Sequence, residues 1–190
     1  MKEIEKILEK TNAILKGHFL LTSGLHSDTY FEKFRIFQYP EYVEKIIKIS
    51  KNLLKNFKFD YVAGPEKGGF FIAYEIARQF KKMAIYLEKS EDKFIIKRNF
   101  ANVEKGKKIL LVDDVLTTGK SLSLLIEDLN KDFKVEAVFV IIDRSERKIN
   151  FNIPLIYLYK KEVKNYNPEE CPLCKNNIPL IRPGSKSIQT

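Results

Sequence analysis

Residues 109–121 read ILLVDDVLTTGKS, and this stretch decides both the fold and the place where chemistry can occur. The apolar residues 109–112 have the length and character of a buried strand. Two carboxylates, Asp113 and Asp114, follow directly, and a turn of small residues, 117–119, leads into a helical pattern at Ser121. The stretch therefore predicts a strand, an acidic strand end, a loop and the start of a helix.

This order of elements suits a phosphorylated sugar. Backbone N–H groups of a small-residue loop and the N-terminus of a helix bind phosphate, and carboxylates accept hydrogen bonds from sugar hydroxyls. The ending Gly119-Lys120-Ser121 is also that of a Walker nucleotide loop, but that pattern needs a glycine where this chain has Asp114, so it is excluded. The remaining alternative is a plain strand-to-helix connection with its acids in solvent.

Composition favours one domain that acts on an anionic substrate. A chain of 190 residues with 44% hydrophobic residues can bury a sizeable core. No apolar run approaches the roughly 20 residues that span a bilayer, and the first residues, MKEIE, do not form a secretory signal. We therefore expect a cytoplasmic protein without a membrane partner. The net charge of +9 is spread along the chain, which indicates attraction of an anionic substrate rather than a nucleic-acid partner.

Hydrophobic periodicity predicts strands that alternate with helices. We expect helices over residues 3–15, 40–54, 70–80 and 121–130, strands over 61–63, 83–87, 94–96, 109–112, 135–142 and 155–159, and a charged turn over 88–93. Residues 18–38 should form short strands and loops, and the tail after residue 159 should be irregular. The alternation is typical of an α/β fold with a mainly parallel central sheet flanked by helices.

Three loops are predicted to meet at one edge of this sheet, because ligands of such sheets bind beyond the carboxyl ends of the strands. They are residues 64–69, residues 113–121 and the segment after Ile142. The last begins with Asp143 and Arg144, and an arginine at a strand end can present its planar fork to a carboxylate or a ring edge. A surface ion-pair cluster is the alternative for this segment.

Residues 109–121 resemble the phosphoribosyl pyrophosphate (PRPP) motif of type I phosphoribosyltransferases, and the whole chain resembles the orotate phosphoribosyltransferases. The similar segments are Gly17-His18-Phe19, Ser23–Ser27 with Tyr30-Phe31, Gly64-Pro65 with Gly68-Gly69, Asp143-Arg144 with Glu146-Arg147, Cys171-Pro172-Leu173-Cys174, and Pro183-Gly184-Ser185. The resemblance implies the type I phosphoribosyltransferase fold in one domain, residues 1–190. Its core would span about residues 39–159, and a small hood would combine about residues 1–38 with the tail, residues 160–190.

The resemblance also implies a reaction of pyrimidine (UMP) biosynthesis: ribose 5-phosphate passes from PRPP to orotate with Mg²⁺, giving orotidine 5′-monophosphate and pyrophosphate. The implied catalytic residues are Asp113, Asp114, Lys89 and Lys93. The implied PRPP-binding residues are Lys67, Asp113, Asp114, Val115, Leu116, Thr117, Thr118, Gly119, Lys120 and Ser121. The implied orotate-binding residues are Thr117, Arg144, Tyr30 and Phe31.

The same resemblance implies that Mg²⁺ binds together with PRPP. The sequence identifies no protein residue as its ligand. The resemblance also implies a homodimer that shares the loop near Lys89 and Lys93 across the interface. Three features depart from the family. The stretch 88–93 is short and lacks the histidine of the family's lid, although Lys97-Arg98 could supply charge; Thr22 replaces a lysine that contacts PRPP; and Lys67 lies one place early.

The only cysteines, Cys171 and Cys174, form a C-x-x-C pair. The sequence favours two reduced thiols that hold down a loop-rich tail, and it does not favour a redox pair, which would normally sit at a helix start in a thioredoxin-like unit. Half of a zinc site is the alternative, because structural zinc usually takes four protein ligands. The only histidines, His18 and His26, lie far away in sequence, and a site between two subunits is conceivable.

Two further functions remain open. One is the same chemistry on a purine base, and the other is a regulator that senses PRPP on the same fold and binds nucleic acid. The aromatic segment around Tyr30 and the element at residues 143–147 favour orotate, since an arginine suits its carboxylate. A regulator would need an added helix-turn-helix or a dense basic face.

Overall fold

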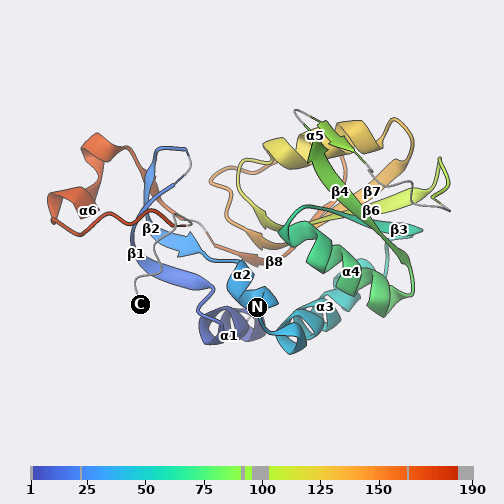
Figure 1. Ribbon diagram of the computed structural model, residues 1–190, viewed down its shortest axis with the longest axis horizontal. Helices are drawn as coiled ribbons and strands as arrows, with labels where there is room; N and C mark the ends of the chain where they lie inside the picture. Colours follow the sequence, from blue (N-terminus) through green and yellow to red (C-terminus); the bar gives the residue numbers. More distant parts are fainter. Residues whose placement is uncertain (1, 22, 91–92, 96–102, 162, 184–190) are drawn as a thin grey trace.

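A computed structural model describes residues 2–21, 23–90, 93–95, 103–161 and 163–183 (Figure 1). The helices are α1 (Lys2–Lys10), α2 (Phe34–Phe37), α3 (Pro40–Leu54), α4 (Gly68–Phe80), α5 (Lys120–Leu129), a 3-10 turn η1 (Pro168–Glu170) and α6 (Pro172–Lys175). The strands are β1 (Ile14–Leu20), β2 (His26–Phe31), β3 (Tyr61–Pro65), β4 (Met83–Ser90), β5 (Lys93–Ile95), β6 (Lys108–Leu116), β7 (Lys134–Asp143), β8 (Leu155–Lys160) and β9 (Asn165–Tyr166). None of the helices in these ranges is long and apolar enough to cross a membrane.

The main sheet has the strand order β5-β4-β3-β6-β7-β8. All neighbouring strands from β4 to β8 pair in parallel, and only β5 runs antiparallel to its neighbour. Helix α4 connects β3 to β4 and α5 connects β6 to β7, because a parallel pair needs a crossover rather than a hairpin. Residues 144–154 connect β7 to β8 without a helix. The prediction of an α/β fold with a mainly parallel sheet is confirmed.

Both faces of the sheet are buried, which explains why its strands read as nearly continuous apolar runs. Side chains alternate between two cores. The core shared with α1, α3 and α4 receives Val62, Leu110, Val112, Ala137, Phe139 and Ile141 from the strands. The core under α5 receives Tyr61, Ala63, Ile109, Leu111, Val138 and Val140. Figure 1 shows α5 on one side of the sheet and α3 and α4 on the other.

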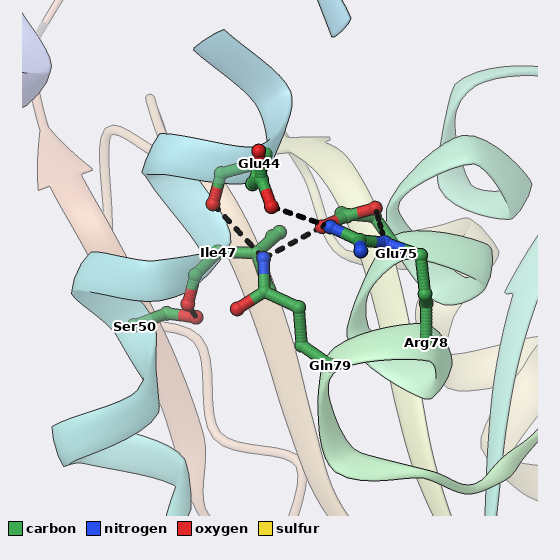
Figure 2. Close-up of polar contacts among 6 residues, drawn as sticks. All are labelled: Glu44, Ile47, Ser50, Glu75, Arg78 and Gln79. Carbon is green, nitrogen blue, oxygen red and sulfur yellow. Dashed lines mark hydrogen bonds and ion pairs between the residues drawn. The ribbon is translucent and has the colours of Figure 1, made fainter. Parts of the chain in front are cut away.

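Helices α3 and α4 are joined at their exposed edge by a polar network, which Figure 2 shows. The guanidinium of Arg78 in α4 donates to Glu44 of α3 at 2.7 Å and to Glu75 of its own helix at 2.8 Å. The amide of Gln79 donates to the Glu44 carbonyl at 3.0 Å. The side chains of Arg78 and Glu44 are exposed, so their ion pair contributes little stability, whereas only 13% of the Glu75 side chain is exposed. The network links α3 to the last turn of α4.

A second, antiparallel sheet has the order β1-β2-β9, and we call it the hood sheet. It joins the N-terminal strands to the tail, and Leu20 and His18 exchange backbone hydrogen bonds with Ile181 at 2.9 and 2.8 Å. Figure 1 shows the hood sheet and α6 to one side of the main sheet. Helix α1 lies outside the hood sheet, because its buried residues pack into the main core.

The first predicted helix, residues 3–15, is too long. Helix α1 ends at Lys10, because Asn12 takes a left-handed conformation (φ 49°) that an α-helix cannot continue. Residues 14 and 15 instead begin β1 and pair with Phe31 and Tyr30. The tail is also less irregular than expected, since it contributes β9, η1 and α6.

The predicted charged turn over residues 88–93 is wrong where the structure describes it, because residues 88–90 belong to β4 and Lys93 begins β5. Residues 91 and 92 lie outside the described residues. Strand β4 continues through Ser90, and Lys89 pairs with Phe94 across an antiparallel ladder. Periodicity could not reveal this extension, because charged residues are ordinary on a solvated edge hairpin. The backbone places Lys89 and Lys93 near the tip of this hairpin. Thr22 and Lys97-Arg98 lie outside the described residues.

Candidate active site

The acid pair lies within β6, which continues past the predicted end at Val112 because its pairing with β7 extends to Leu116. Successive side chains of a strand point to opposite faces. Asp113 accordingly lines a pocket with the loop that follows the strand. Asp114 points the other way, toward Lys33 and Gly68. The two carboxylates thus flank the strand end, where both can meet one ligand.

Asp114 is buried, with 4% of its side chain exposed, and it forms an ion pair with Lys33. Nζ of Lys33 lies 3.0 Å from Oδ1 and 2.9 Å from Oδ2 of Asp114. Burial raises the pKa of Asp114 above its ordinary value, and the nearby charge of Lys33 offsets only part of that rise. Burial alone would lower the pKa of Lys33, but the charge of Asp114 and the hydrogen bond to it raise that pKa. No local sequence pattern marks Lys33 as part of the site, because it lies 81 positions from Asp114.

Asp113 holds its proton more tightly than an ordinary aspartate. Burial, and next the charge of Asp114, raise the pKa of Asp113 to about 7. The backbone N–H of Asp114 donates to Oδ1 of Asp113 at 2.8 Å, which acts in the opposite direction by stabilising the carboxylate. A carboxyl group poised near neutral pH can change its charge when a ligand arrives.

The loop at residues 117–119 and the first residues of α5 line a pocket of about 100 Å³. Gly119 takes the left-handed conformation (φ 77°) immediately before α5. A side chain at Gly119 would also meet Ile149 at 3.0 Å, so both conformation and space require glycine. Thr117, Thr118, Lys120 and Ser121 are exposed. The first N–H groups of α5 lack helical acceptors, and that of Lys120 donates only to the Thr118 hydroxyl, at 3.4 Å, so this helix start suits an anion in the pocket.

The loop between β3 and α4 approaches the acid pair so closely that it needs glycine. A Cβ atom on Gly68 would lie 1.7 Å from Oδ2 of Asp114, and one on Gly64 would lie 2.2 Å from the Gly69 carbonyl oxygen. Lys67 is exposed and stands just before the first turn of α4. This loop therefore brings an ammonium group and a helix N-terminus to the rim beside Asp114.

Arg144 follows β7 on the same rim. Its backbone N–H donates to the Leu116 carbonyl at 2.9 Å, which ties it to the end of β6. The preceding Asp143 is buried and accepts hydrogen bonds from the backbone N–H and hydroxyl of Ser145 at 2.9 and 2.6 Å. Burial lowers the pKa of Arg144 below its ordinary value, with the nearby Tyr30 and Glu146 acting in the other direction. A half-buried guanidinium of this kind suits an anionic ligand group.

The two aromatic residues of β2 point to opposite faces. Phe31 is 5% exposed and belongs to the main core, so its ring is unavailable to a ligand. Tyr30 is half-buried and packs on Phe19, with ring centroids 5.7 Å apart. Burial raises the pKa of Tyr30, and the charges of Lys33 and Arg144 lower it, which places both cations within electrostatic range of the phenol. Of the two predicted orotate-binding aromatics, only Tyr30 faces the site.

The acid pair fits Mg²⁺ that is bound mainly through a ligand. Over the described part of the chain, no third carboxylate, histidine or cysteine joins Asp113 and Asp114 closely enough to complete a cluster. Mg²⁺ keeps several waters and typically binds through one or two carboxylates together with substrate phosphates. Two carboxylates beside a small-residue loop and a helix N-terminus, a combination that suits phosphate, meet that requirement.

Comparison with known proteins agrees with this geometry. A family model described as "Phosphoribosyl transferase domain" matches residues 35–167. The orotate phosphoribosyltransferase of Caldanaerobacter subterraneus is 42% identical over 98% of this chain and 98% of its own length. That of Thermotoga maritima is 40% identical over 98% of this chain and 100% of its own length.

Solved structures show the same fold at lower identity. The orotate phosphoribosyltransferase of Aeropyrum pernix superposes with a TM-score of 0.67 at 24% identity, over 83% of this chain and 93% of that one. The Leishmania donovani UMP synthase superposes with a TM-score of 0.70 at 22% identity, over 83% of this chain and 36% of that one. The family resemblance read from the sequence motifs is confirmed.

Proposed function

The chain belongs to the phosphoribosyltransferase family, and we propose from this premise that it transfers ribose 5-phosphate from PRPP to orotate, a pentosyltransferase reaction. The observation that favours orotate over another base is the placement of Arg144 and Tyr30 on one rim with the acid pair. The full-length relatives at about 40% identity are orotate phosphoribosyltransferases, which supports the same choice.

The acids would act on the ribose. Cleavage at the anomeric carbon builds positive charge on the sugar and negative charge on the departing pyrophosphate. Asp113 and Asp114 would accept hydrogen bonds from the ribose hydroxyls and stabilise that positive charge through their own negative charge. The ion pair with Lys33 would hold Asp114 in place, because both its oxygens lie within 3.0 Å of the ammonium. A ring nitrogen of orotate would attack the anomeric carbon, so no covalent enzyme intermediate is needed.

The two loops would divide the phosphates of PRPP. The backbone of residues 115–119 and the first turn of α5, including Lys120 and Ser121, would hold the 5′-phosphate in the pocket beside Asp113. Lys67 and the N-terminus of α4 would face the pyrophosphate. Mg²⁺ bound with PRPP would neutralise charge on the pyrophosphate, with Asp113 or Asp114 as the nearby carboxylate.

Arg144 would bind the orotate carboxylate through its guanidinium fork, and Tyr30 would pack against the pyrimidine ring. Thr117, at the start of the loop, would reach the base from the opposite side. A neutral purine base has no carboxylate, so it would leave a half-buried guanidinium without its partner, which is costly. This is the physical ground for preferring orotate to adenine or hypoxanthine.

Lys89 and Lys93 would complete the site of a second subunit in a homodimer. The β4–β5 hairpin that carries them lies at one edge of the main sheet. Strands β3 and β6 separate it from β7, which precedes Arg144. Phe71 and Tyr74 of α4 are 53% and 60% exposed, and Phe37 of α2 packs on Phe71 at 5.2 Å, which supports an apolar contact surface. Light scattering would show a mass twice that of the chain.

We propose the cytoplasm as the location of the protein, where soluble PRPP and orotate would be available.

The deciding experiment is a spectrophotometric assay of orotate consumption with PRPP and Mg²⁺, run beside adenine, hypoxanthine and uracil. Among these four bases, we expect only orotate to be converted. Turnover with a purine at equal or higher kcat/KM would replace the proposal by the purine-base reaction. PRPP binding without turnover of any base, together with salt-sensitive binding to DNA or RNA, would favour a PRPP-sensing regulator.

A further inference from the structure

Four side chains of the hood converge, although they come from distant parts of the sequence. His18 lies in β1, His26 begins β2, and Cys171 and Cys174 flank the start of α6 in the tail. The side-chain atoms that could bind a metal, one from each residue, all lie within 4.8 Å of one another. The sequence indicates at most half of a zinc site, with a site between two subunits conceivable, because the histidines lie far from the cysteines along the chain. The fold instead brings all four residues together within one chain. From this convergence we propose a structural zinc site with two cysteine and two histidine ligands within one chain.

The distances between the ligand atoms fit a tetrahedron around one ion. Nε2 of His18 lies 3.5 Å from Sγ of Cys171 and 3.7 Å from Sγ of Cys174. Nδ1 of His26 lies 3.3 Å from Sγ of Cys174 and 2.9 Å from Nε2 of His18. Zinc bonds of about 2.0–2.3 Å place tetrahedral nitrogen and sulfur ligands about 3.5 Å apart. These three nitrogen–sulfur distances are close to this value, the two nitrogens would need to separate slightly, and the remaining pairs of ligand atoms lie within 4.8 Å of each other.

A backbone contact fixes the tautomer of His18 that a metal requires. Nδ1 of His18 lies 2.7 Å from the carbonyl oxygen of Ile178. A carbonyl can only accept, so Nδ1 carries the proton and the lone pair of Nε2 points toward His26 and the two thiols. Histidines that bind metals typically donate their second nitrogen in this way, which orients the ring and strengthens the ligand.

The site lies where the fold lacks an apolar core. Between residues 164 and 183, Cys171 is the single side chain classed as buried, and the rest are partly or fully exposed. His18 and His26 are 1% and 5% exposed, whereas Cys174 is exposed and gives the ion a route in. A short tail without its own core needs another source of stability, and a bound metal supplies folding free energy directly.

The ligand types select the metal. Thiolates and imidazoles in a closed tetrahedral set favour zinc over Mg²⁺ or Ca²⁺, which prefer oxygen ligands. The site is therefore separate in kind from the acid pair, and the inference does not rest on the proposed reaction. Since His26 and Tyr30 lie in the same strand, the ion would tie the tail to the strand that carries Tyr30.

The test is the metal content of the full chain, purified without chelators and under reducing conditions. Mass spectrometry of the dissolved metal should find about one zinc per chain. Replacement by Co²⁺ should give the absorption of a tetrahedral cobalt centre together with a thiolate-to-cobalt charge-transfer band. Chelation should lower the thermal unfolding midpoint, and zinc, but not magnesium, should restore it.

Variants locate the ligands. Cys174→Ser should lose its zinc to a competing chelator, whereas Lys175→Ala, an exposed change in the same helix, should retain zinc as the unchanged protein does. Zinc retained equally in Cys174→Ser would overturn the proposal. The proposal would also fail if the unchanged protein bound neither zinc nor cobalt, or if it were isolated with a Cys171–Cys174 disulfide. If Cys174→Ser does not fold, the cobalt spectrum of the unchanged chain tests the proposal by itself. A tetrahedral centre with a thiolate-to-cobalt band supports it, and the absence of that band contradicts it.

Discussion

The rim of the main sheet and the hood place polar groups in opposite ways. At the rim, the acid pair and the loop at residues 117–119 are consecutive in sequence, because one strand, one turn and one helix start supply them all. In the hood, β1, β2 and the tail each contribute one or two groups, and the pairing of His18 with Cys171 spans 153 positions. The rim thus depends on local conformation, and the hood depends on long-range contacts. Substitutions in the two regions should therefore fail in different ways.

The largest effect should come from the rim. Asp114→Asn keeps the shape of the side chain but removes the charge that would stabilise the developing cation, so kcat should fall by about 100- to 1,000-fold. The PRPP KM should change much less. Steady-state kinetics with both substrates would measure this, and circular dichroism would verify folding. Turnover at the level of the unchanged protein would remove Asp114 from the chemistry.

Arg144→Ala should act on one substrate only. Loss of a charge-assisted hydrogen bond of about 1.5–3 kcal/mol should raise the orotate KM by about 10- to 100-fold and leave the PRPP KM nearly unchanged. Arg147→Ala is the matched control, because Arg147 is exposed in the same segment. Equal changes in the orotate KM and the PRPP KM would show that Arg144 does not bind the pyrimidine specifically. They would also contradict the assignment of the two substrates to separate parts of the rim.

The contrast between the regions also explains which features the sequence predicts. The alternation of strands and helices, the loop at residues 117–119 and the position of Arg144 follow from periodicity, small residues and the rule that ligands bind at strand ends. The ion pair of Lys33 with Asp114 does not, because it joins residues 81 positions apart and no local pattern marks it. The choice between Tyr30 and Phe31 needed the register of β2, since a shift of one residue would exchange their faces.

Tyr30→Ala tests whether the hood contributes to the base site. Loss of an aromatic contact should raise the orotate KM by about 3- to 10-fold, less than the loss of a charge. Tyr39→Ala, at an exposed tyrosine before α3, is the control and should leave both KM values unchanged. An unchanged orotate KM in Tyr30→Ala would confine base recognition to the main-sheet rim.

The smallest effect concerns the pH dependence of stability at the rim. In the folded protein the pKa of Asp113 is about 7, above its ordinary value of 3.8, so between these values the folded state binds the proton that the unfolded state has lost. The stabilising contribution of the protonated form is complete below pH about 3.8 and is lost as pH rises through about 7. Asp113→Asn has no such proton to lose. The variant should therefore gain on the order of 1 kcal/mol relative to the unchanged protein between pH 5 and pH 8.

Urea unfolding of both unliganded proteins at the two pH values would measure this gain. A stability difference that stays constant between pH 5 and pH 8 would mean that Asp113 is already ionised at pH 5, and that its burial does not govern its charge. A difference that grows with pH would show that the rim holds a carboxyl group which folding alone keeps protonated. Ligand binding at this position would then have to release a proton, so PRPP affinity should strengthen as pH rises through about 7, and it should do so less in Asp113→Asn.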